Sequence, residues 1–249
     1  MTESTALAPQ RRQEILRQSW SVGLATGLYG ISFGALSVAA GLSVLQTQSL
    51  SLLMFTGGSQ FAFVGIIGAG GLAAAPAAIA TATMLSIRNG LYALQTSRFL
   101  EVTGLRRLGA AQVTIDESTA VGIGQPEREG QRLGFWHTGL AVFLFWNLMT
   151  FVGALAGNAL GDPRVWGLDG AAVAAFTALV WPRLASTTAR LAAALAVALA
   201  LISSPLVPAG VPVLIAALAA VLLGLRSAAQ EEPPLEGEDG QLPGADPVP

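Results

Sequence analysis

Two short stretches, Phe55-Thr56-Gly57-Gly58-Ser59-Gln60-Phe61 and Ser86-Ile87-Arg88-Asn89-Gly90-Leu91-Tyr92, interrupt apolar runs of this sequence. The first contains two adjacent glycines flanked by polar residues, and the second contains an arginine. A charge near the centre of a bilayer and a break in a helical backbone both need partners, because lipid offers none. In a membrane protein, such features typically mark a transport pathway.

The composition of the 249 residues is typical of a membrane protein. Hydrophobic residues make up 53% and charged residues only 11%, and the mean hydropathy is +0.60. Several apolar runs approach the roughly 20 residues that an α-helix needs to cross the hydrocarbon core. The chain contains no cysteine, which excludes disulfides, thiolate catalysis and cysteine-based metal sites.

The apolar runs predict an all-α, polytopic helical membrane protein with about seven segments, one of which is a candidate for a broken or re-entrant element. Residues 1–19 form a predicted N-terminal lead on the cytoplasmic side, and residues 20–227 form the transmembrane domain. Residues 228–249 contain six acidic residues, no basic residue and many Pro and Gly, which predicts a disordered acidic tail. The predicted apolar segments are 20–42, 49–68, 72–95, 138–160, 167–182, 191–207 and 210–225.

Arginines set the expected orientation, since positively charged loops stay in the cytoplasm. Seven alternating spans from an inside N-terminus place the loop after residue 95 outside, although that loop contains five arginines. An even number of crossings between residues 20 and 95 removes the conflict and places both the N-terminus and this loop inside. It requires a re-entrant or broken element in segment 49–68 or 72–95, or a dip of residues 108–124 into the membrane. The alternative is an outside N-terminus with seven full spans and a weaker arginine bias.

The glycine pair Gly57-Gly58 has two interpretations. A helix broken at this point would offer free N–H and C=O groups to a polar substrate, with Ser59 and Gln60 adding side-chain hydrogen bonds. The alternative is close packing of two helices through small residues, which is common in membranes. These four residues are candidates for substrate binding or gating.

Arg88 lies about 16 residues into the segment 72–95. Its side chain could extend to the bilayer interface, as arginines near helix ends commonly do. If it lies deep, it requires a carboxylate or a substrate as partner. Asn89 beside it adds hydrogen-bonding capacity, so both residues are candidates for substrate binding or gating.

Three acidic residues are candidates for binding an ammonium group or for carrying protons. Asp169 opens the segment 167–182, where it could also be a helix cap. Asp116 and Glu117 lie in the long loop, where they could cap a short helix or lie in solvent. An adjacent acidic pair in such an apolar protein could instead pair with Arg88, gate the cytoplasmic mouth or exchange protons.

At these residues the sequence resembles AzlC, the large subunit of bacterial branched-chain amino acid exporters. The resemblance covers about residues 20–225. It rests on five motifs in order, which are FTGGSQF at 55–61, IRNGLYAL at 87–94, TIDESTAV at 114–121, WNLMTFVGALAGNALGDP at 146–163 and GLDGAAVAAF at 167–176.

The resemblance implies a multi-pass permease of the inner (plasma) membrane that exports branched-chain or related amino acids; the cytoplasmic N-terminus is expected from the arginines alone. It also implies a small hydrophobic partner subunit of the AzlD type. The sequence contains no nucleotide-binding motif, so we expect a secondary, proton-coupled mechanism without a cofactor or metal and without a nucleic-acid partner.

Two other classes of function stay open at this point. A structural membrane subunit would lack its own substrate pathway and would depend on a partner to complete the site. An intramembrane enzyme is less favoured, because the single histidine, His137, lies in no recognisable nucleophile motif. We therefore expect a transporter subunit and no enzyme activity.

Overall fold

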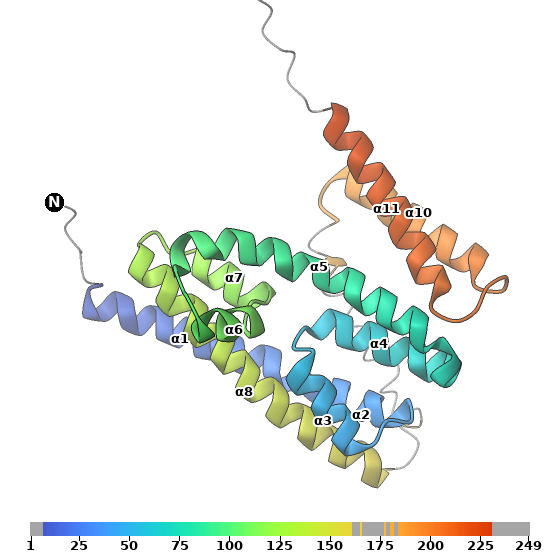
Figure 1. Ribbon diagram of the computed structural model, residues 1–249, viewed down its shortest axis with the longest axis horizontal. Coiled ribbons are helices and arrows are strands. Elements are labelled where there is room, and N and C mark those ends of the chain that lie inside the picture. Colours follow the sequence, from blue (N-terminus) through green and yellow to red (C-terminus); the bar gives the residue numbers. More distant parts are fainter. Residues whose placement is uncertain (1–6, 161–164, 166–176, 178–179, 182–183, 231–249) are drawn as a thin grey trace, which may run out of the picture.

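The computed structural model describes residues 7–160, 165, 177, 180–181 and 184–230, and their regular secondary structure is helical (Figure 1). This confirms the predicted all-α fold. The helices of the first half are α1 (Pro9–Leu28), α2 (Gly30–Ala39), α3 (Val44–Leu53), α4 (Gly57–Gly70), the 3₁₀ turn η1 (Gly71–Ala74) and α5 (Ala75–Leu100). They are followed by α6 (Leu105–Gln112), α7 (Asp116–Ile123), α8 (Arg128–Leu160), α10 (Thr187–Ser203) and α11 (Val211–Gln230).

Glycines allow α1 and α2 to pack closely along α8. The four glycines at positions 23, 27, 30 and 34 recur every three or four residues, so they share one helix face. A Cβ added at Gly30 would lie 2.8 Å from the carbonyl oxygen of Trp146, and one added at Gly34 would collide with the backbone of Thr150. The two helical segments therefore touch backbone to backbone, as small residues permit in membrane proteins.

The predicted apolar segment 49–68 is two helices rather than one. α3 begins with a capping box between Ser43 and Gln46 and ends at Leu53. Thr56 is extended, with φ −157°, and α4 begins at Gly57. The structure thus contains the break expected near the glycine pair, and it lies immediately before the first glycine.

α4 and α5 form an antiparallel helical hairpin (Figure 1). The turn between them lies at Gly71, whose φ of +60° favours glycine because a side chain would strain this conformation. Pro76 lies in the first turn of α5, where its missing N–H costs no hydrogen bond.

The N-terminus and the arginine-rich connection after α5 lie at the same end of the molecule (Figure 1). The Leu7 amide donates to Glu129, and the Arg11 guanidinium donates to Gln125 at 2.9 Å. The chain leaves this end along α1 and α2 and returns to it along α5, which is the course that an even number of crossings between residues 20 and 95 would give. Short helices lie at two of the positions predicted for a re-entrant element, namely α3 and α4 in segment 49–68, and α6 and α7 around residues 108–124.

Residues 96–137 are not the long loop expected from the sequence. They contain the end of α5, the short helices α6 and α7, and the first turns of α8, which begins ten residues before the predicted segment. Glu101 ends α5 and accepts hydrogen bonds from Arg128 and Arg132. The sequence predicted a loop here because the stretch contains many charged residues. Two of these, Arg128 and Arg132, belong to the first turns of α8, where they pair with Glu101 and stay exposed to solvent at the end of the bundle.

Three stretches of the described chain are long and apolar enough to cross a membrane, namely Pro9–Ala39, Gly57–Leu100 and Arg128–Ala159. Residues 9–19 of the predicted lead already belong to α1. The predicted segments 191–207 and 210–225 correspond to α10 and α11, whereas most of 167–182, including Asp169, lies outside the described residues. Most of the predicted tail, residues 231–249, also lies outside them.

Candidate functional site

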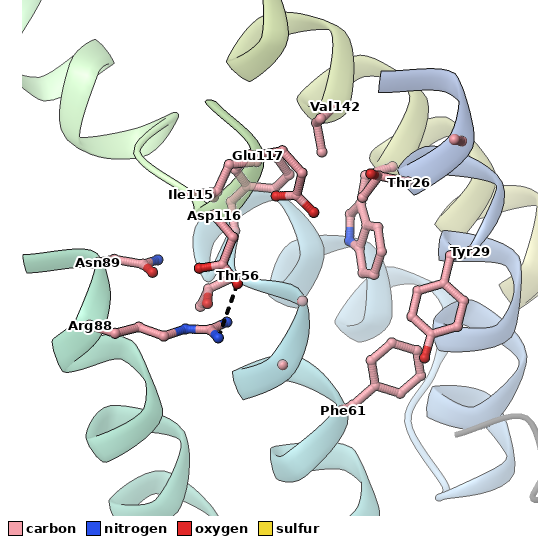
Figure 2. Close-up of a pocket in the computed structure, with 15 residues that line it drawn as sticks. Thr26, Tyr29, Thr56, Phe61, Arg88, Asn89, Ile115, Asp116, Glu117 and Val142 are labelled. Carbon is pink, nitrogen blue, oxygen red and sulfur yellow. Dashed lines mark ion pairs between the residues drawn. The ribbon is translucent and has the colours of Figure 1, made fainter. Parts of the chain in front are cut away.

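A cavity of about 390 Å³ lies where the α3–α4 break meets α1, α5, α7 and α8. Its volume is within the range of about 300–1,000 Å³ that is usual for small-molecule sites. Figure 2 shows charged side chains of α5 and α7 facing Tyr29, the residue after α1, and Phe61 of α4 across it. The lining residues are Ala25, Thr26, Tyr29, Phe55, Thr56, Gly57, Gly58, Phe61, Arg88, Asn89, Ile115, Asp116, Glu117, Val142 and Trp146.

An ion pair joins α5 to the first residue of α7. Arg88 Nη1 lies 3.1 Å from Asp116 Oδ2, and about one third of each side chain is exposed (Figure 2). One further polar atom of each residue makes no hydrogen bond, since Arg88 Nε and Asp116 Oδ1 are buried without a partner in the structure. The Oδ1 atom of Asn89 is also buried without a hydrogen-bond partner. Such atoms indicate a place where a ligand or water belongs.

Glu117 follows Asp116 and points into the same cavity (Figure 2). Burial raises the pKa of its carboxyl above the ordinary value, and the neighbouring Asp116 adds to the rise. A hydrogen bond from its own backbone, the charge of Arg88 and a hydrogen bond from Thr26 oppose it. Ser118 Oγ fixes the start of α7 by accepting the Ile115 N–H at 3.1 Å. The cavity therefore contains a second carboxyl group without an arginine partner of its own.

Aromatic rings form the opposite wall. The rings of Tyr29 and Phe61 have centroids 5.0 Å apart, and Trp146 stacks on Phe33 at 6.0 Å. Trp146 is only 3% exposed, and its indole N–H has no acceptor in the structure. The wall is thus apolar, with one buried donor at its edge.

Both glycines of the pair line this cavity, and each faces a side chain of a neighbouring helix. A Cβ added at Gly57 would lie 3.3 Å from the ring of Trp146, and one added at Gly58 would lie 3.2 Å from Arg88 Nη2. The absence of side chains at the first turn of α4 therefore makes room for an indole ring and a guanidinium group.

Ser59 and Gln60 lie behind the cavity and do not line it. Ser59 Oγ is 3.0 Å from Ser86 Oγ and 3.4 Å from Thr56 Oγ1, so it links α4 to α5. Gln60 Nε2 lies 3.4 Å from the carbonyl oxygens of Leu50 and Ser51, which belong to the last turn of α3. Both residues hold the break together.

The structure thus brings together six of the nine candidate residues in one cavity, namely Gly57, Gly58, Arg88, Asn89, Asp116 and Glu117. Sequence reasoning missed Tyr29, Thr26 and Trp146. Tyr29 and Thr26 carry no local signal, since they look like ordinary residues of an apolar helix. Trp146 lies inside one of the quoted motifs but was not assigned to a site.

Among the described residues, no cluster of three or more His, Cys, Asp or Glu side chains could hold a metal ion. The fold and the cavity define a helical membrane protein with a polar site at a broken helix.

A family model described as AzlC protein matches residues 21–160, more than half of the chain, and the chain belongs to this family. No curated protein and no solved structure matches it. The family is one of membrane proteins associated with transport and is not an enzyme family.

Proposed function

We propose that this chain is the permease subunit of a secondary transporter that exports branched-chain or related amino acids across the inner (plasma) membrane. The observation that carries the proposal is a single cavity with an arginine, two carboxyl groups and an apolar wall at a break between two short helices. Membership of the AzlC family supports the substrate class.

An amino acid zwitterion has three parts that must be recognised. Its carboxylate requires N–H donors, which Arg88 and the first turn of α4 provide. Its ammonium group requires an acceptor, and Glu117 is the carboxyl group without an arginine partner. A branched aliphatic side chain would face apolar residues such as Ile115 and Val142, which line the cavity. Each part of such a substrate would therefore meet cavity residues of matching polarity.

Proton coupling would use the same carboxyl groups. Glu117 has a raised pKa because it is buried, so its protonated form persists to higher pH than that of an exposed glutamate. An incoming ammonium group favours the ionised form and would release the proton. We propose this exchange as the link between substrate and proton movement.

We propose that the arginine-rich end, which contains the N-terminus and α6, faces the cytoplasm. Single cysteines at Ala111 in α6 and at Leu72 in η1 test this orientation, since both positions are exposed and the chain has no cysteine of its own. In intact cells, an impermeant maleimide should label the cysteine at position 72 and not the one at position 111. The reverse pattern would contradict the proposed orientation.

The test of the proposed function is counterflow of labelled leucine, valine and methionine, with lysine as a non-branched control, in vesicles. The full chain is measured with and without a small hydrophobic membrane subunit of the AzlD type, which we propose as its partner. Saturable exchange of leucine, valine and methionine, but not of lysine, is expected with both chains present. Exchange that persists unchanged in Arg88→Ala would instead favour a structural subunit whose partner contains the pathway.

A further inference from the structure

We infer that the cavity contains a carboxylate subsite, formed by Arg88, the first turn of α4 and the Trp146 indole N–H, and that Asp116 occupies it as an internal anion until a substrate carboxylate displaces it. The inference deepens the proposed function and rests on it for the identity of the substrate. Asp116 would thus compete with the substrate carboxylate for the same N–H donors.

The first turn of α4 provides unused donors. The side chain of the N-cap residue Thr56 caps none of the backbone N–H groups of the first turn, and its carbonyl accepts the N–H of Gln60. Within the described part of the chain, the N–H groups of residues 57–59 have no acceptor. A helix N-terminus carries partial positive charge, so these donors favour an anion.

Two side chains with N–H donors lie against this turn and line the same cavity. Trp146 is 97% buried and its indole N–H has no partner, and the six-membered part of the same indole lies against Gly57. The Arg88 guanidinium lies against Gly58. A positive guanidinium beside a positive helix end is unfavourable unless an anion lies between them.

Asp116 is the anion present. Its Oδ2 pairs with Arg88, whereas its Oδ1 is buried without a partner (Figure 2). The Asp116 carboxylate therefore binds only some of the N–H donors of the subsite. The carboxylate of a free ligand could pair with Arg88 and also accept hydrogen bonds from the N–H groups of residues 57–59. Because Asp116 is the first residue of α7, its displacement would break the ion pair that joins α7 to α5.

The experiment measures ligand binding by calorimetry to the full chain in lipid nanodiscs. The ligands are L-leucine, 4-methylpentanoate, which has the carboxylate without the ammonium group, and 3-methylbutylamine, which has the ammonium group without the carboxylate. If Asp116 blocks the subsite in about nine of ten molecules, Asp116→Asn should bind both carboxylates about tenfold more tightly than the unmodified protein. The affinity for the amine should not increase.

Glu101→Gln is the matched control, because it also removes a carboxylate paired with arginine, at the end of the bundle. It should leave all three affinities unchanged. Trp146→Phe keeps the ring and removes the N–H, and it should weaken carboxylate binding at least about threefold without weakening amine binding. This variant also tests the subsite if Asp116→Asn does not fold.

Folded Asp116→Asn that binds carboxylates no more tightly, or not at all, would overturn the inference. So would a Trp146→Phe variant that weakens all three ligands equally, since that is the result of a purely structural role. The two proposals fail separately. Leucine counterflow without tighter binding in Asp116→Asn would leave the transport function and remove the subsite, whereas tighter binding of 4-methylpentanoate without leucine counterflow would do the opposite.

Discussion

Glycines serve two different purposes in two regions of this molecule. Along the contact of α1 and α2 with α8, glycines let backbones touch, and an added Cβ would meet main-chain atoms of the partner helix. At the start of α4, glycines face the ring of Trp146 and the guanidinium of Arg88. Backbone atoms cannot move aside, whereas the end of an arginine side chain can. We therefore expect substitutions in the first region to affect folding and those in the second to affect transport.

The largest effect is expected for Gly34→Val in α2. Its side chain would collide with the backbone of Thr150 and Ala154 in α8, so we expect a loss of at least about 3 kcal/mol of stability and little folded protein. Size-exclusion chromatography and thermal unfolding in detergent measure this. Gly65→Ala in α4 is the control, because an added Cβ there meets nothing within 4 Å. Equal behaviour of the two variants would remove the distinction between the regions.

Arg88→Ala should reduce transport strongly while the protein still folds. Removing one partner of a charged pair typically costs at least about 2 kcal/mol, which corresponds to about a thirtyfold loss in leucine counterflow. Arg88→Lys keeps the charge without the planar donor fork, and should restore part of the rate. A full rate in both variants would show that Arg88 serves only the packing of the cavity.

Gly58→Ala sharpens the comparison, since it places a glycine substitution in the cavity itself. The new Cβ would lie 3.2 Å from Arg88 Nη2, so the guanidinium that pairs with Asp116 must shift to make room for it. We expect stability within about 1 kcal/mol of the unmodified protein, because the gain in helix propensity offsets the crowding. Counterflow should fall about tenfold. Gly90→Ala, next to Asn89 on the open side of α5, should leave both quantities unchanged.

The smallest effect is expected for Glu101→Gln at the arginine-rich end. Glu101 pairs with Arg128 and Arg132, but all three side chains are well exposed. Exposed ion pairs contribute at most about 1 kcal/mol, and salt screens them. The difference in melting temperature from the unmodified protein should therefore shrink further in high salt. A large decrease in melting temperature that does not depend on salt would show that these ion pairs of Glu101 hold α5 and α8 together.

Residue type alone predicted much of the candidate site. Arg88 and the acidic pair Asp116-Glu117 were candidates because charges are costly in an apolar chain, and the structure places them in one cavity. Ser59 and Gln60 were candidates because they flank the glycines, but helix geometry points them behind the break toward Ser86 and the end of α3. Periodicity could not decide this, since the direction of a side chain depends on where the helix begins.

The sequence by itself determined the helical membrane fold, the family and the position of the broken helix, because hydrophobic runs, arginine placement and a glycine pair are local properties of the chain. Only the tertiary structure decided that Arg88 meets Asp116 across 28 positions of sequence, and that Tyr29 and Trp146 complete the cavity. It also separated the glycines that pack backbones from those that make room for a site. These outcomes depend on which helix faces lie together, and that is set by packing among distant segments of the chain.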